Sequence, residues 1–156
     1  MKKTYQKSSK NGFTIVEMII VMVIIGVILS AVIAVGQGAT NTSRIASTTA
    51  TIKAIQTAAA SYYNANGGSY SGGTLGNITL ANLASNGYLP TKAAGNDAWG
   101  GAITVAPDAN ANYFDITLAG VPNSTVYAAI TAGVSNLIQT TPGTYSSTAQ
   151  TWSAAF

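Results

Sequence analysis

One long apolar segment near the N-terminus limits what this chain can fold into more than any other feature. Residues 13–35 read FTIVEMIIVMVIIGVILSAVIAV, and Glu17 is the only charged residue among them. A helix of this length rises about 35 Å at ~1.5 Å per residue, which is enough to cross a hydrocarbon core of ~30 Å. The run is also longer than the ~7–15 apolar residues of a cleaved secretory signal. We therefore expect a membrane-spanning helix.

The positive charge of the chain is concentrated ahead of this segment. Four of the seven Lys and Arg residues lie in the first ten residues, and the formal net charge is +3. By the positive-inside rule we expect a cytoplasmic N-terminus and an exported remainder. Beyond the first ten residues the chain holds three cations and four carboxylates. Nucleic-acid binding needs a basic surface that follows phosphates, so none is predicted for the body.

The composition also limits the chemistry that this chain can perform. It contains no His and no Cys, and only 7% of its residues are charged, against roughly 25% in ordinary domains. Imidazole acid–base catalysis, a thiolate nucleophile, a disulfide and the usual zinc or haem ligands are therefore excluded. The carboxylates Asp97, Asp108 and Asp115 have no visible base or nucleophile beside them. We expect no catalytic residue, no metal and no cofactor.

Glu17 needs an explanation, because a carboxylate at the centre of a bilayer costs ~2.5–3.5 kcal/mol on insertion scales. One explanation is that Glu17 lies shallow enough to reach the water at the lipid headgroups. The other is that its charge finds a partner, because isolated charges in an apolar medium are tolerated mainly when they are paired. The residues by themselves allow both.

The residues around Glu17 resemble the N-terminal motif of a known protein family. Lys10-Asn11-Gly12-Phe13-Thr14-Ile15-Val16-Glu17, followed by an apolar helix, resembles the N-terminus of type IV prepilins. The resemblance implies that residues 1–12 are a leader peptide and that a membrane aspartyl peptidase cuts between Gly12 and Phe13. It further implies that Phe13 is N-methylated and that Glu17, the fifth residue of the mature subunit, is the family's acidic assembly position.

Electrostatics supplies a mechanism for that assembly role. Cleavage after Gly12 creates a free amine on Phe13, and stacked apolar helices form a core of low dielectric. Glu17 of one subunit and the Phe13 amine of a neighbour would attract each other strongly there. A single polar pair in an apolar seam selects one axial offset between helices.

The helix is predicted to continue beyond the apolar segment. Ile45, Ile52, Ile55, Ala59 and Tyr62 form one stripe at helical spacing, and Asn66-Gly67-Gly68 is a stop signal. We expect one long helix, with residues 13–36 as its apolar half and residues 37–66 as an amphipathic half. The alternative is a separate soluble helix after a flexible joint at residues 36–41. The resemblance implies that such a helix can melt partway along in the fibre, and Gly26 and residues 36–38 are the places where glycine would weaken it.

Residues 67–156 are predicted to form a globular head. We expect a loop at residues 67–77 and a short helix at residues 80–84. Two strands joined by a turn should follow at residues 102–105 and 113–118. A second helix at residues 125–138 and a last strand at residues 145–155 complete the head. A long helix packed on a small antiparallel sheet gives the α+β class, with the roll typical of pilins. The Gly95–Gly101 stretch and the Val121-Pro122 step resemble the type IVb branch, although the usual cysteine pair is missing.

Two weaker patterns point to common local structure. Asp108, Asn110 and Asn112 match the opening of a calcium loop, but Tyr113 stands where that loop needs glycine. We therefore expect a hairpin turn there. Three N-glycosylation acceptor patterns, at Asn41, Asn77 and Asn123, are expected by chance in a chain this rich in Asn, Ser and Thr.

The resemblance implies a structural function. The chain is expected to be a major-type pilin that starts in the inner membrane and ends in an extracellular filament of its own copies. Its implied partners are copies of itself, the prepilin peptidase, an inner-membrane assembly platform and, before assembly, the membrane. A minor pilin or a type II secretion pseudopilin is the alternative within the family. An uncleaved membrane-anchored binding module and an envelope-anchored hydrolase are the alternatives outside it.

Overall fold

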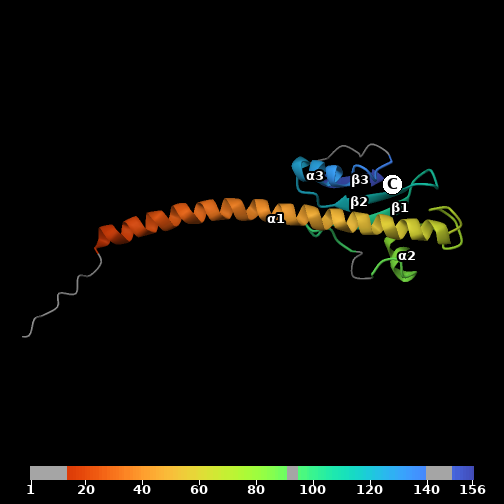
Figure 1. Cartoon of the computed structure of the whole chain (residues 1–156), viewed down its shortest axis with the longest axis horizontal. Coiled ribbons are helices and arrows are strands. Elements are labelled where there is room, and N and C mark those ends of the chain that lie inside the picture. Colours follow the sequence, from red (N-terminus) through yellow and green to blue (C-terminus); the bar gives the residue numbers. More distant parts are fainter. Residues whose placement is uncertain (1–13, 91–94, 140–148) are drawn as a thin grey trace, which may run out of the picture. The chain divides into compact units, whose positions relative to one another are not determined.

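The computed structural model describes residues 14–90, 95–139 and 149–156. Its elements, in chain order, are α1 (Ile15–Ala65), α2 (Leu80–Ser85), β1 (Ile103–Pro107), β2 (Phe114–Ala119), α3 (Ser124–Val134) and β3 (Thr151–Ala155) (Figure 1). The strands form one antiparallel sheet in the order β1-β2-β3. The predicted α+β class, a long N-terminal helix with a small antiparallel sheet, is confirmed.

The chain divides into two compact units, Met1–Ala39 and Thr40–Phe156. In the first unit, the described residues form only the N-terminal part of α1. The second unit contains the rest of α1, the sheet and the two shorter helices. Figure 1 shows α3 and the sheet lying alongside the C-terminal part of α1.

Helix α1 runs without a break through residues 36–41. No proline occurs before Pro90, and proline is the residue that breaks helices most strongly. The helix ends at the predicted stop. The amide of Gly68 donates to the Tyr63 carbonyl at 2.9 Å, and Gly67 has a φ of 78°. This is the Schellman arrangement, which needs a residue that tolerates the left-handed region.

The sheet supplies one wall of the core through strict alternation. Along β2, Phe114, Ile116 and Leu118 are buried while the residues between them are partly exposed. Ile116 is paired with Val105 of β1 and with Ala154 of β3. Antiparallel strands with one buried face show this period of two.

The predicted stripe of α1 supplies the opposite wall. Ile52, Ile55, Ala59 and Tyr62 are each 0% exposed, and Ile45 is half-buried beside them. Helix α3 adds its own buried residues, Val126, Ile130 and Val134. Gly133 marks a close contact between the two helices, because a Cβ placed there would lie 3.0 Å from Cγ2 of Thr49.

Helix α3 is shorter than predicted. It ends at Val134, whereas the apolar pattern predicted a helix to about residue 138. The sequence around the end contains Gly133, Ser135 and Asn136, which are poor helix formers. Leu137 instead closes a turn by donating its amide to the Val134 carbonyl at 2.9 Å, and it still packs against the core. For the predicted last strand, residues 140–148 lie outside the described residues, and β3 begins at Thr151.

The Asp108–Asn112 pattern is a turn between β1 and β2. The Asp108 Oδ1 accepts a hydrogen bond from the Asn110 amide at 2.9 Å, and the Asn110 Oδ1 accepts one from the Asn112 amide at 3.1 Å. These oxygens stabilise the turn backbone, as Asx turns commonly do. Asn123, which the glycosylation pattern includes, is the N-cap of α3 and accepts from the Val126 amide at 3.0 Å.

Candidate processing and assembly site

Thr14 and Glu17 hold the first turn of α1 together. The Glu17 amide donates to the Thr14 Oγ1 at 3.3 Å, and the Thr14 amide donates to the Glu17 Oε2 at 3.4 Å. The Thr14 hydroxyl also donates to that carboxylate oxygen at 3.4 Å. This reciprocal arrangement is a capping box, with Thr14 as the N-cap and Glu17 three residues later.

The capping role of Thr14 was not among the sequence predictions, although the sequence carries its signal. Thr14-Ile15-Val16-Glu17 has the S/T-x-x-E form directly before an apolar run. The same residues form the prepilin-like pattern, so one glutamate has both a local and an assembly explanation.

The site combines one carboxylate with the positive end of a helix. Glu17 is exposed in the first turn of α1, where the helix dipole favours negative charge. From Thr14 to Ser43 no other residue is charged. The carboxylate therefore has no competing side-chain charge within about 40 Å of helix at ~1.5 Å per residue.

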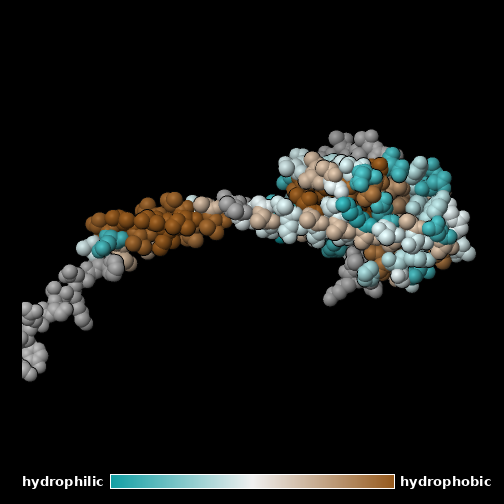
Figure 2. Space-filling view, in the orientation of Figure 1, coloured by the Kyte–Doolittle hydropathy of each residue, from teal (hydrophilic) through white to brown (hydrophobic). Residues whose placement is uncertain are grey.

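A continuous apolar surface follows the site. Large apolar side chains between Ile15 and Ile33 are 44–80% exposed, and Figure 2 shows this stretch of α1 as one hydrophobic surface. Among the described residues, α1 is long and apolar enough to cross a membrane, judged by its length and composition. Exposure of an apolar surface of this size to water is unfavourable, so lipid or other protein must cover it.

The structure describes only one of the three predicted site residues. Gly12 and Phe13 lie outside the described residues. Glu17 is described, and its carboxylate is 3.4 Å from the amide nitrogen of Thr14, the residue that follows Phe13 in sequence. Glu17 is therefore the fifth residue after the predicted cleavage point, and its carboxylate contacts the second, Thr14.

The three remaining carboxylates lie in the second unit and do not gather into one cluster. Asp97 is only 7% exposed, and its Oδ1 accepts hydrogen bonds from the amides of Trp99 at 2.9 Å and Gly101 at 2.8 Å. Asp115 lies on β2, where burial and then the nearby Asp108 raise the pKa of its carboxyl. Within residues 14–90, 95–139 and 149–156, no three His, Cys, Asp or Glu residues are placed to hold a metal ion.

Comparison with known families favours a processed precursor over a plain membrane anchor. Residues 7–33 match the family model described as the prokaryotic N-terminal methylation motif. The chain carries a type IV prepilin leader. No curated protein matches the chain.

The leader determines the broad class of this prepilin-like chain. The motif supports a precursor of a type IV pilin-like protein or a pseudopilin, and it implies processing by a prepilin peptidase and assembly at the membrane. The leader and the apolar part of α1 fit a single-pass precursor in the inner membrane. The motif points to a structural protein rather than an enzyme.

Proposed function

We propose that the chain is the major-type pilin of an extracellular type IV filament. The precursor sits in the inner membrane with its N-terminus in the cytoplasm. The peptidase cuts between Gly12 and Phe13, Phe13 is methylated, and an assembly platform adds the subunit to a homopolymer. The observation that carries the proposal is the exposed apolar surface of α1, with one carboxylate in its first turn, directly behind a prepilin leader.

The proposal assigns a role to each part of the chain. Residues 1–12 are the leader, residues 13–36 form the fibre core, residues 37–66 join the core to the head, and residues 67–156 are the head. The large apolar side chains of the first unit support the fibre-core role, because those that the structure describes are 44–80% exposed. Copies packed side by side would bury them at ~25 cal/mol per Å² of apolar surface.

Glu17 is proposed to set the axial register of the filament. The two hydrogen bonds that its carboxylate accepts are long, at 3.4 Å, and both use Oε2. A carboxylate accepts about four hydrogen bonds, so Glu17 can cap its own helix and still bind the Phe13 amine of a neighbour. In a helix core of low dielectric this pair is strong, and a one-turn slip would separate it.

The first test is the chemical form of the protein at the cell surface. Mass spectrometry of sheared filaments is expected to show a chain that lacks residues 1–12 and begins with methylated Phe13, as the most abundant protein of the fraction. The same chain in trace amounts would instead identify a minor pilin or a pseudopilin. Recovery of only the uncleaved chain, from membranes, would overturn the proposal.

The second test addresses Glu17. The Glu17→Ala precursor is expected to lose its leader normally and to form no filaments, because the register pair is missing. Ser30→Ala is the matched control, since Ser30 is also a polar residue of the apolar helix but donates only to the Val27 carbonyl, at 2.7 Å. Normal filaments from Glu17→Ala would contradict the pairing.

A further inference from the structure

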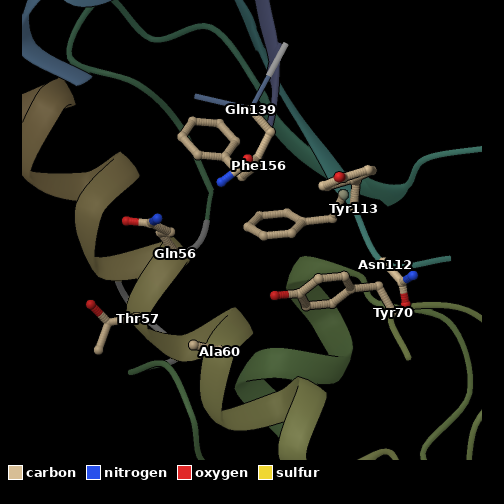
Figure 3. A pocket seen from close by; sticks show the side chains of 9 residues that line it. Gln56, Thr57, Ala60, Tyr70, Asn112, Tyr113, Gln139 and Phe156 are labelled. Carbon is tan, nitrogen blue, oxygen red and sulfur yellow. The ribbon is translucent and has the colours of Figure 1, made fainter. Parts of the chain in front are cut away.

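The second unit contains a cavity that the filament proposal does not use. Its volume is about 460 Å³, within the ~300–1,000 Å³ of small-molecule sites. The cavity lies between α1, which contributes Gln56 and Ala60, and a group of aromatic side chains that includes Tyr70 and Phe156 (Figure 3). All of these residues belong to the unit Thr40–Phe156.

Packed aromatic rings form one wall of the cavity. The ring centroids of Tyr70 and Phe114 are 4.8 Å apart, and those of Phe114 and Phe156 are 5.6 Å apart with nearly parallel planes. Phe114 and Phe156 are 1% and 5% exposed, whereas Tyr70 is only half-buried. The ring centroids of Phe114 and Tyr63 each lie 4.8 Å from that of Tyr70, and the exposed part of the Tyr70 ring lines the cavity.

Polar groups with unused hydrogen-bonding capacity surround this wall. The amides of Gln56 and Gln139 and the hydroxyl of Tyr70 have no hydrogen-bond partner among the described residues. Burial, and then the neighbouring Tyr63, raise the pKa of Tyr70, so its hydroxyl keeps its proton near neutral pH and can donate. The Asn112 Oδ1 accepts from the Tyr63 hydroxyl at 3.2 Å, which orients the amide group at the cavity rim.

The chemistry of the lining restricts the ligand. None of the described residues that line the cavity has a charged side chain. A phosphate or a nucleic acid would need cations, and a calcium ion would need carboxylates. A purely apolar ligand that covered the primary amides would bury them without partners, which is unfavourable for polar groups. The ligand should be neutral, carry several groups that both donate and accept, and present one apolar face.

We propose that this cavity binds a neutral saccharide. One C–H face of a pyranose ring packs on the ring of Tyr70, because aromatic faces carry negative charge density and C–H groups are weakly positive. The sugar hydroxyls exchange hydrogen bonds with the amides of Gln56 and Gln139, each of which offers a donor and an acceptor. The head of the subunit would thus recognise glycans as well as fill the filament surface.

Binding is measured with the full chain in a detergent that has no sugar headgroup, such as an amine oxide. Saturation-transfer NMR is recorded with maltose, lactose, cellobiose and chitobiose, and with sialyllactose as an anionic probe. We expect transfer to at least one neutral disaccharide, with a dissociation constant on the order of 1 mM, about −4 kcal/mol. Absence of transfer to every neutral sugar would overturn the proposal, as would a preference for the anionic probe.

Four variants locate the binding. Gln56→Ala removes one amide from the lining, and Ala60→Phe fills the cavity from α1. Both are expected to weaken binding at least tenfold. The matched controls on α1 are Asn64→Ala and Ala54→Phe, which are also exposed but lie outside the cavity, and they should bind like the parent chain. Circular dichroism confirms that each variant is folded, and undiminished binding by folded Ala60→Phe would exclude this cavity as the site.

Discussion

At the N-terminus of α1, Thr14 and Glu17 satisfy polar groups that the start of a helix otherwise leaves unpaired. Such groups are especially costly in an apolar environment, because no water replaces the missing partner. The capping box therefore has a function before assembly: it gives the carboxylate local partners while the precursor is in the membrane. Thr14 is consequently a positioning residue for Glu17.

Substitution of Thr14 tests this role. Thr14→Val keeps the side-chain volume but removes the oxygen that accepts from the Glu17 amide, and loss of an N-cap typically costs ~1 kcal/mol. We expect the Glu17 amide to exchange its hydrogen about fivefold faster, measured by NMR on the full chain in detergent micelles. Thr14→Ser should retain the slow exchange. Equal rates in all three chains would show that the capping box contributes nothing.

Asp115 is a residue whose ionisation opposes folding. Its pKa is raised above the ordinary value of 3.8, first by burial and then by Asp108, so the folded chain holds the proton more tightly than the unfolded chain does. Stability should therefore fall as the pH rises from 3.8 through the raised pKa, and should stay lower above it.

Asp115→Asn removes that ionisation. The variant is expected to melt at a higher temperature than the parent at pH 7, and the difference should shrink as the pH falls below 3.8, where Asp115 is protonated in both states. Thermal melts followed by circular dichroism across this pH range provide the measurement. Asp108→Asn is the control and should produce a smaller gain, since burial is the larger cause. A pH-independent difference would assign the effect to something other than the charge.

At the scale of elements, the loop before β1 depends on one close backbone approach. A Cβ placed on Gly101 would lie 1.0 Å from the carbonyl oxygen of Ala119, the last residue of β2. Asp97 stabilises the same loop through the Gly101 amide. The resemblance of this stretch to a pilin branch pointed to the glycine, but only the fold shows that β2 is what it contacts.

Gly101→Ala is expected to destabilise the second unit by at least ~3 kcal/mol, the upper end of typical overpacking costs, because neither backbone can move away cheaply. Gly95→Ala, in the same loop, is the control. Nothing lies within 4 Å of a Cβ at that position, and the change should stay within ~0.5 kcal/mol. Urea unfolding monitored by tryptophan fluorescence distinguishes the two, and similar midpoints would contradict the contact.

The helices show which sequence signals were sufficient to predict where an element begins and ends. The stripe from Ile45 to Tyr62 and the Asn66-Gly67-Gly68 stop predicted the amphipathic part of α1 and its end correctly, because helical period and glycine capping are local properties. The end of α3 was predicted four residues late. Leu137 and Ile138 continue the apolar pattern, yet they pack against the core from a turn, and such packing is a tertiary property.

At the scale of the whole molecule, the two units have different sources of stability. Every residue of the hydrophobic core lies in the unit Thr40–Phe156, while the described apolar side chains of the first unit are exposed. The second unit carries its own core, which is the usual requirement for folding alone. The first unit depends on an apolar environment outside the subunit.

A fragment that begins at Thr40 tests this division. It is expected to be soluble and monomeric and to melt within about 5 °C of the second unit in the full chain, which corresponds to a change of ~1–2 kcal/mol. Calorimetry of the fragment in buffer and of the full chain in detergent supplies the comparison. Ile55→Ala, which removes a fully buried side chain, should lower the melting temperature in both and serves as the reference for a core defect. An unfolded or aggregated fragment would show that residues before Thr40 support the head.

Some properties of this protein follow from its sequence by itself. The membrane-spanning length of residues 13–35, the leader pattern ending at Gly12, the position of Glu17 and the buried stripe of α1 all depend on short-range order along the chain. Local patterns of this kind can be recognised in the sequence because a helix repeats its geometry every few residues.

Only the tertiary structure decided how distant residues meet. It placed Gly101 against Ala119, buried Asp97, brought Asp108 near Asp115, and assembled the cavity from α1 together with Tyr70 and Phe156. These contacts depend on how sheet and helices pack around one core. No spacing in the sequence encodes that packing directly, because each contact joins segments that the chain separates by many residues.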